Sequence, residues 1–452
     1  MGHVVRMTAT GAFGITFIFL VDAANLFWVS QLGRPQLVAA IGFAYAIQFF
    51  SVSVGVGLMI TTTALVSRSI GAGEVDQARR QAGAAITIAL SVMAAVVTLI
   101  VGFRYGLVAL AGAEGETARL AARYLAMTVP ALLPMSVALV LSGTLRAYGY
   151  GAKAMYVTML SGLVLLVLDP ILIFYMGLGL DGAAIGLVLF RFTLLILAIA
   201  FAILQLRLVD RPRLRTLRRL LPPFVAVATP TIATQMSTPA GNYFLTMVMA
   251  PFGDEAMAAW AVVGRLTVVV FGGIFALSGA IGGIFGQNFG AGQMARVRST
   301  YRDALVFCGI YTVVAWVLLL SVTSLVIDAF ALTGLGAEVL RAFSLVGVGG
   351  FVFIGALFVS NAAFNNLGRP SWSTLVNWIK DGALSWPAAA GLALVFGAPG
   401  VIYGQALAGA LVGTLAALWG WSYVRGLKGP QEVDLDPIFP RPYPNPDRFR
   451  RR

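Results

Sequence analysis

The chain has 452 residues, of which 59% are hydrophobic and only 11% charged, with a mean hydropathy of +0.89. A water-soluble domain carries about 25% charged residues. This composition therefore excludes a water-soluble protein and indicates a protein surrounded by lipid. The net charge is +13, and the only cysteine and histidine are Cys308 and His3. An intrachain disulfide is thereby excluded, and zinc chemistry and Ser-His-Asp catalysis are disfavoured.

Apolar segments long enough to cross a bilayer core of about 30 Å as helices recur along the whole chain. They predict an all-α polytopic membrane protein with twelve transmembrane spans. The first segment is too long for a cleavable signal peptide and lacks a small-residue cleavage site. The spans are residues 6–31, 36–67, 77–103, 117–145, 152–176, 182–206, 221–250, 255–285, 301–328, 337–365, 371–396 and 399–424.

Basic residues gather in every second connection, and most densely between spans 6 and 7. The alternate connections hold few, except the one between spans 3 and 4, which has Arg104, Arg119 and Arg123. The positive-inside rule then predicts that the even connections and both termini are cytoplasmic. This placement points to the lipid bilayer, and not to nucleic acid, as the partner of the positive charge.

The two halves of the chain repeat each other. "RSIGAGEVDQARRQ" (68–81) aligns with "QNFGAGQMARVRST" (287–300), and "LRAYGYGAKAMYV" (145–157) aligns with "FNNLGRPSWSTLV" (364–376), both at an offset of 219 residues. Each repeat holds six spans, an even number, so both halves enter the membrane in the same orientation. We therefore expect two six-helix bundles related by a pseudo-two-fold axis along the membrane normal.

This repeat predicts four parts of the chain. They are an N-lobe of spans 1–6 (residues 1–206), a basic cytoplasmic linker (207–220), a C-lobe of spans 7–12 (221–427) and a basic cytoplasmic tail (428–452). Two facing bundles enclose a central cavity, and rocking between them gives alternating access. The architecture favours a secondary transporter over a channel or a membrane-embedded enzyme.

Acids inside the spans are the strongest functional signals, because a charge at a helix centre costs at least ~2.5 kcal/mol. Asp22 lies on span 1, and Asp169 lies on span 5 in "LVLLVLDPILIF" (163–174), directly before Pro170. The proline predicts a kink that opens a polar notch. Desolvation favours the neutral form of a carboxyl group, so Asp22 and Asp169 are candidate ion-coupling residues. The alternative is a static ion pair, for which Arg191 on span 6 is the candidate partner.

Other polar residues in the spans are candidates for lining the substrate cavity. They are Asn25, Tyr45, Gln48, Arg191, Gln235, Asn242 and Asn361. Lys380 and Asp381, adjacent on span 11 near its predicted cytoplasmic end, are expected to reach the interface or to pair with each other. We expect no metal site and no cofactor.

Four segments resemble multidrug and toxic compound extrusion transporters. "VDAANLFWVSQLG" (21–33) resembles their first span and "LSGTLRAYGYGAKAMYVTMLSGLVLLVLDPILIFYMGLGLDGAAIG" (141–186) their spans 4–6, whereas "FGQNFGAG" (285–292) and "FNNLGRPSWSTLVNW" (364–378) resemble second-half signatures. The resemblance covers essentially the whole chain. It implies export of small organic cations across a bacterial cytoplasmic (inner) membrane, by a monomer, in exchange for protons or sodium ions. It also implies that Asp22 and Asp169 match the N-lobe acids of the branch related to the DNA-damage-inducible transporters.

The sequence departs from that family around Asp169. Leu165, Leu187 and Phe190 stand where the family often has asparagine, threonine or serine. A sodium ion needs several oxygen ligands, whereas a proton needs one carboxylate, so these residues favour proton coupling. They also leave open an acid that stays protonated and does not couple. The rival function is a related lipid-linked sugar or phospholipid flippase, which would need a larger and strongly basic cavity.

Overall fold

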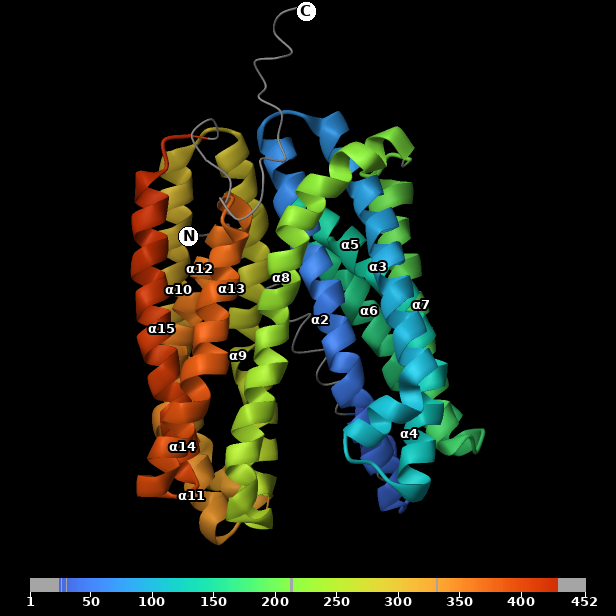
Figure 1. The fold of residues 1–452 in the computed structure, drawn as a ribbon, viewed down its shortest axis with the longest axis vertical. Coiled ribbons are helices and arrows are strands. Elements are labelled where there is room, and N and C mark those ends of the chain that lie inside the picture. The colour runs from blue at the N-terminus through green and yellow to red at the C-terminus, as the bar shows by residue number, and fades with distance from the viewer. Residues whose placement is uncertain (1–23, 26, 30, 212–213, 331, 430–452) are drawn as a thin grey trace, which may run out of the picture.

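In a computed structural model, the chain is a bundle of long helices arranged in two lobes (Figure 1). The structure describes residues 24–25, 27–29, 31–211, 214–330 and 332–429. Asp22, most of predicted span 1 and most of the predicted tail lie outside these residues. Within them, the other eleven predicted spans are all helical, so the predicted fold class is confirmed.

The helices of the N-lobe follow the predicted spans 2–6. They are α2 (Pro35–Gly71), α3 (Val75–Leu110), α4 (Gly115–Thr128) joined through η1 (Val129–Ala131) to α5 (Leu132–Ala147), α6 (Gly151–Pro170) with the π-helical η2 (Ile171–Tyr175), and α7 (Gly179–Ile199) with η3 (Ala200–Gln205).

The C-lobe repeats this order. Its helices are α8 (Leu214–Met249) with η4 (Ala250–Phe252), α9 (Asp254–Gly290), α10 (Met294–Ala329), α11 (Gly334–Ala342) joined through η5 (Phe343–Gly347) to α12 (Val348–Leu367), α13 (Pro370–Trp378) joined through η6 (Ile379–Leu384) to α14 (Ser385–Phe396), and α15 (Pro399–Gly426).

Glycines of the repeat end equivalent helices in the two lobes. Gly149 follows α5 with φ +85°, and its repeat partner Gly368 follows α12 with φ +106°. Glycine adopts a positive φ without the steric cost of a side chain, so each residue lets the chain turn sharply into the next helix. The sequence repeat is therefore also a repeat of backbone conformation.

Nine helices of the described residues are long and apolar enough to cross a membrane. Helix α8 and the rod formed by α13, η6 and α14 are not among the nine. Helix α8 contains four prolines and a row of buried polar residues, Thr231, Thr234 and Ser237. The hydroxyl groups of Thr231 and Thr234 donate to carbonyls of the same helix, each at 2.8 Å. Internal hydrogen bonds of this kind allow a less apolar helix to lie inside a bundle.

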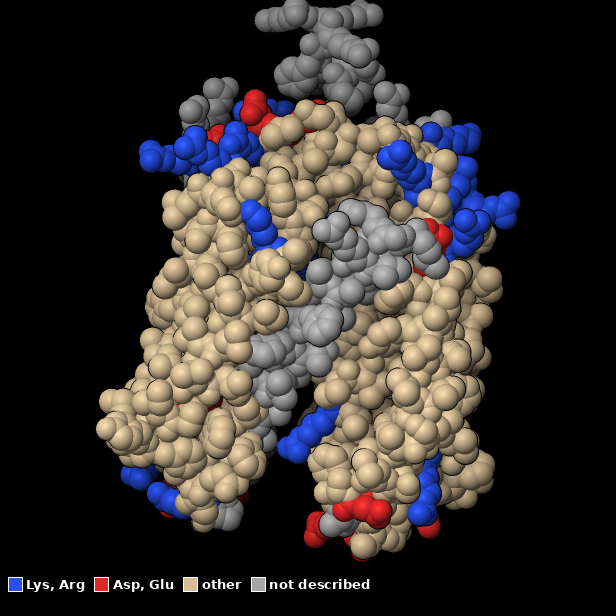
Figure 2. Space-filling model, turned by 180° about the vertical axis from the view of Figure 1, so that it is seen from behind, with Lys and Arg blue, Asp and Glu red and all other residues tan. Residues whose placement is uncertain are grey.

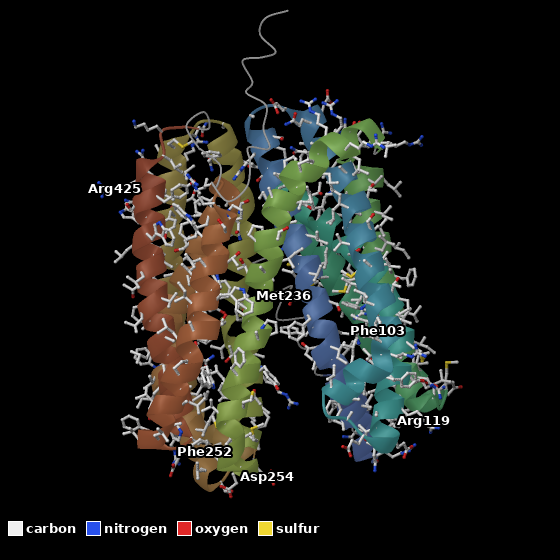
Figure 3. The ribbon with its side chains drawn as sticks, viewed as in Figure 1. Phe103, Arg119, Met236, Phe252, Asp254 and Arg425 are labelled. Carbon is white, nitrogen blue, oxygen red and sulfur yellow. The ribbon has the colours of Figure 1, made fainter. Side chains whose placement is uncertain are left out.

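Charged side chains lie mainly at the two ends of the molecule, with an uncharged belt between them (Figure 2). We call the end that carries the connections 72–74, 148–150, 206–213, 291–293 and 368–369 the basic end, and the other the opposite end. Arg425 lies at the basic end, whereas Arg119 and Asp254 lie at the opposite end of the N-lobe and of the C-lobe (Figure 3).

The two lobes touch closely at the basic end, where α2 meets α9. A Cβ atom built on Gly71 would lie 2.0 Å from the carbonyl oxygen of Gln287, and one on Gly290 would lie 2.1 Å from that of Arg68. Hydrogen bonds cross the same contact: Arg68 Nε donates to the Asn366 carbonyl (2.7 Å), and Gln287 Nε2 donates to the Ala147 carbonyl (2.6 Å). The backbones can approach this far only because glycine has no side chain.

Helix α8 connects the lobes because each half of it packs in a different one. Phe224 and Val227, in the first half, belong to a hydrophobic cluster with residues of α2, α3 and α5. Leu245 and Met249, in the second half, belong to the main cluster of the C-lobe. The helix begins at Leu214, inside the predicted linker, so the basic residues after that point are helical. Toward the opposite end, a notch separates the lobes (Figure 2).

We predict that Gly71→Ala shifts the protein away from this conformation. The added methyl group would overlap the Gln287 carbonyl, so the lobes must separate at the basic end and rock together at the opposite end. Spin labels at Leu110 and Leu394, both exposed and one on each lobe, would report a shorter distance. Cys308 is buried and will not take up label.

The matched control is Gly102→Ala, because a Cβ atom on Gly102 meets nothing within 4 Å. It should leave the distance distribution unchanged. An unchanged distribution in Gly71→Ala would show that the glycine contact does not hold the basic end closed.

Candidate functional site

Asp169 lies near the end of α6 and is buried in the N-lobe, with 1% of its surface exposed. Pro170 follows and cannot donate a backbone hydrogen bond, and the helix continues as the π-helical η2. Asn25, which belongs to predicted span 1, donates from Nδ2 to Asp169 Oδ2 at 2.6 Å. The structure thus joins two residues that the sequence placed separately, one as a coupling acid and one as a cavity residue.

The surroundings of Asp169 are mostly apolar. Gly186 on α7 faces the carboxylate, since a Cβ atom there would lie 2.2 Å from Asp169 Oδ1 and 3.0 Å from Leu165 Cδ1. Leu165 and Phe190 are buried in one hydrophobic cluster, and Leu187 packs against it. The three residues that depart from the family pattern therefore form an apolar wall on this side of the N-lobe.

Arg191 is also buried in the N-lobe, where it bridges neighbouring helices. Its guanidinium donates to the Thr128 carbonyl and to Gln48 Oε1, both at 2.6 Å. Gln48 Nε2 in turn donates to the Thr128 hydroxyl at 3.1 Å. This network joins α2, α4 and α7, so two of the predicted cavity residues, Gln48 and Arg191, contact each other inside the lobe.

The remaining predicted cavity residues lie in different surroundings. Asn361 is buried in the C-lobe, where its Oδ1 accepts from Asn377 Nδ2 at 2.9 Å. Tyr45 and Asn242 are exposed, and Gln235 is half-buried. Their role in a substrate cavity stays a prediction. Asp22 lies outside the described residues.

A second buried carboxylate, which the sequence did not identify as a site, lies in the C-lobe. Ser237 Oγ on α8 donates to Asp381 Oδ2 at 3.0 Å, and Gly241 makes room, since a Cβ atom there would lie 2.7 Å from Asp381 Cβ. Asp381 belongs to the π-helical η6. The pairs Asn25–Asp169 and Ser237–Asp381 are both 144 residues apart and both join the first span of a lobe to its fifth. The repeat offset of 219 residues aligns Asp169 with Ala388 and not with Asp381, so the sequence signal that could have revealed the second site is the acid inside predicted span 11 itself.

The two carboxylates differ in the partners that they bind. Lys380 forms a salt bridge with Asp381 Oδ1, so the C-lobe acid has an ammonium group from the adjacent residue as its counter-ion. The expected pairing of Lys380 with Asp381 is confirmed, although the pair is largely buried. The Lys380 ammonium therefore supplies a counter-charge to this carboxylate from within the chain.

A family model described as MatE matches residues 12–171 and 230–387. The chain belongs to the multidrug and toxic compound extrusion (MATE) family. The two matches begin at residues 12 and 230, close to the repeat offset of 219 residues. The protein is therefore a secondary transporter with several membrane-spanning helices, and not an enzyme.

Similar proteins come from several bacteria. The FAD transporter of Shewanella oneidensis is 25% identical over 90% of this chain and 92% of its own length. The multidrug export protein MepA of Staphylococcus aureus is 22% identical over 87% of each chain. The crystal structure of a mutant of the Vibrio cholerae MATE transporter VcmN has a TM-score of 0.88, with 22% identity over 94% of this chain and 97% of its own, which shows a shared fold.

We predict that Arg191→Lys lowers the free energy of unfolding by about 2–4 kcal/mol, because lysine cannot reach both acceptors and leaves buried groups unpaired. Thermal or denaturant unfolding in detergent micelles measures the change. The control is Arg123→Lys, since Arg123 pairs with Asp181 at the surface and should cost less than about 1 kcal/mol. Equal losses in the two variants would contradict a structural role for the buried network.

Proposed function

We propose that this MATE transporter exports organic cations in exchange for protons, and that Asp169 of the N-lobe is the coupling residue together with Asp22. The observation that carries the proposal is the pair Asn25–Asp169, a buried carboxylate held by a neutral amide. A hydrogen bond from a neutral amide does not require a charged acceptor, and in this proposal the carboxyl group of Asp169 binds and releases the transported proton. On this ground we also assign the chain to the branch related to the DNA-damage-inducible transporters.

Protons are favoured over sodium ions by the groups around the acid. The described neighbours of Asp169 include an amide, Gly186 and the side chain of Leu165. A sodium ion in a protein site is bound by several oxygen atoms, whereas a proton requires one. The apolar wall of Leu165, Leu187 and Phe190 adds no oxygen ligand for a sodium ion.

The two lobes provide the motion that coupling needs. With the basic end at the cytoplasm, as the positive-inside rule predicts, the notch at the opposite end makes this the outward-open state of a protein in the bacterial inner membrane. A proton entering from outside would neutralise Asp169. An organic cation entering from the cytoplasm would favour the ionised acid and so release the proton, which is a coupling free energy between two ligands.

The C-lobe acid has a different part in this proposal. Because Lys380 pairs with Asp381 within the chain, we assign this site a structural part, in which Asp381 joins η6 to Ser237 of α8. The pair therefore supplies a control for the coupling residue, because it also joins the first span of its lobe to the fifth.

We predict that Asp169→Asn abolishes proton-driven uptake of a fluorescent organic cation into liposomes that contain the purified transporter, while exchange without a gradient continues. The amide of the variant cannot bind and release a proton, so the proton gradient can no longer drive uptake of the cation. Asp22→Asn should behave in the same way. Removal of sodium should change the wild-type rate by less than about twofold.

The control is the double variant Lys380→Met with Asp381→Asn, which removes both charges of the C-lobe pair and should keep gradient-driven uptake. If Asp169→Asn kept full gradient-driven uptake, Asp169 would not be the coupling residue. If wild-type uptake required sodium, the proton would not be the coupling ion. A parallel assay with FAD, the compound named for one relative, tests the substrate class. Uptake of FAD without uptake of the cation would refute a cationic substrate.

A further inference from the structure

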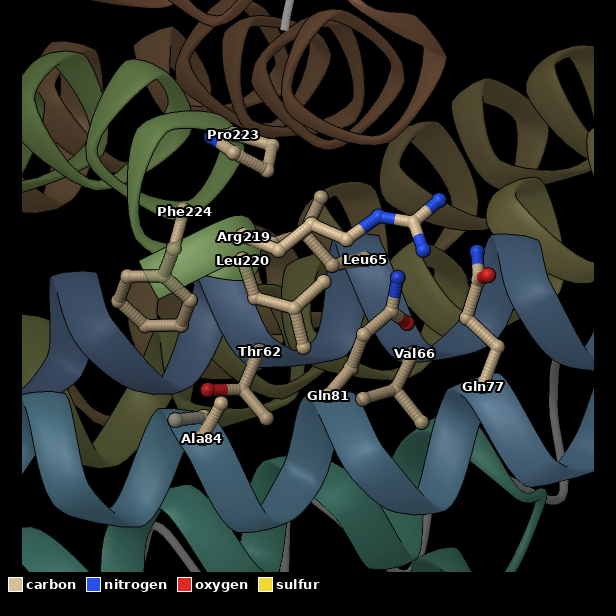
Figure 4. Close-up of a pocket in the computed structure, with 11 residues that line it drawn as sticks. Thr62, Leu65, Val66, Gln77, Gln81, Ala84, Arg219, Leu220, Pro223 and Phe224 are labelled. Atoms are coloured by element: carbon tan, nitrogen blue, oxygen red, sulfur yellow. The ribbon is translucent and has the colours of Figure 1, made fainter. Parts of the chain in front are cut away.

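A pocket of about 60 Å³ lies at the basic end, where the first turns of α8 cross α2 and α3 (Figure 4). It is separate from both carboxylate sites. Residues of all three helices line it, among them Val66 on α2, Gln81 on α3 and Phe224 on α8.

The polar side chains at its rim are hydrogen-bond donors. The guanidinium of Arg219 and the amide groups of Gln77 and Gln81 point to the same side of the pocket (Figure 4). The Ser69 hydroxyl donates to Gln81 Oε1 at 2.9 Å and accepts from Gln77 Nε2 at 3.5 Å, which leaves the amide NH2 of Gln81 and one N–H of Gln77 as donors. None of the residues that line the pocket is acidic. Converging donors with one fixed positive charge fit a phosphate group, which carries several acceptor oxygens.

The floor of the pocket is apolar. Leu65, Val66 and Phe224 are buried there, and Leu220 and Pro223 continue the surface along α8. A free phosphate ion would make no apolar contact with this floor. A phospholipid has a phosphate next to a glycerol backbone and acyl chains, so it matches both the rim and the floor.

The location adds the charge that attracts such a lipid. Arg79 and Arg80 in the first turns of α3 and Arg218 in the first turns of α8 add positive charge at the basic end, which attracts an anionic leaflet. The acids before and in the first turn of α3, Glu74 and Asp76, line a neighbouring hollow with Arg80, and Gln77 is the residue that lines both hollows. Neither acid lines the pocket itself.

We propose that the pocket formed by α2, α3 and α8 binds the phosphate head group of an anionic phospholipid. Since these turns of α8 pack on the N-lobe and the rest of the helix packs in the C-lobe, a lipid held here would stabilise the contact between the lobes at the basic end. The proposal concerns the fold and not the transported ion, so it does not depend on the proposed function.

The test measures the thermal unfolding of the purified full-length protein in detergent while short-chain phosphatidylglycerol is added. Phosphatidylcholine, which carries no net charge, and inorganic phosphate are the comparison ligands. Phosphatidylglycerol should raise the unfolding temperature at concentrations where the other two have no effect. Arg219→Gln should weaken its apparent affinity about tenfold, the loss expected for one charge-assisted contact.

Arg218→Gln is the matched control, because Arg218 is the adjacent exposed arginine and does not line the pocket. It should change the affinity by less than about twofold. Gln77→Leu removes a donor without changing the charge, and a weakened affinity in this variant would support the pocket even if Arg219→Gln did not fold.

Equal losses in Arg218→Gln and Arg219→Gln would overturn the proposal, because they would indicate diffuse attraction to the surface. An equal response to phosphatidylcholine would exclude selection of an anionic head group. Stabilisation or displacement by inorganic phosphate at the same concentration would assign the pocket to a free anion and not to a lipid.

Discussion

The closed basic end depends on backbone contact between the lobes at glycine. At Gly71 and Gly290 the chains of α2 and α9 approach so closely that a single added carbon would overlap a carbonyl oxygen. Hydrogen bonds from Arg68 and Gln287 then reach acceptors on the other lobe. Because both lobes are rigid helix bundles, contact at one end fixes their angle and leaves the notch at the other. The contact at the basic end therefore accounts for the notch between the lobes toward the opposite end.

Helix α8 gives the two lobes a common element. Its first half packs with α2, α3 and α5, and its second half packs in the C-lobe, so motion of one lobe is transmitted along it. The crossing with α2 is close: a Cβ atom on Gly57 would lie 2.6 Å from Ile232, and the hydroxyl groups of Thr61 and Thr231 are 2.8 Å apart. The proposed lipid pocket lies beside the same helix, which is why an occupant there would act on the contact between lobes.

The two lobes each bury a carboxylate, but the two carboxylates have different partners. Each joins the first span of its lobe to the fifth, and each has a glycine against it, Gly186 or Gly241. Asp169 accepts from an amide, whereas Asp381 pairs with the ammonium of Lys380. Both lobes therefore bury a carboxylate between their first and fifth spans, but at positions that the repeat offset of 219 residues does not align.

The spans, the two lobes and the repeat could be predicted from the sequence, because hydrocarbon forces every backbone group to pair within its own helix and glycine alone turns easily at their ends. Asp169 could be identified as well, since an acid in an apolar run is conspicuous. The sequence did not reveal that Asn25 is its partner, that Arg191 binds Gln48 and Thr128, or that Asp381 accepts from Ser237. Those contacts join residues 63 to 144 positions apart. Only the packing of helices decides them, because it is set by the shapes of distant side chains and not by any local pattern.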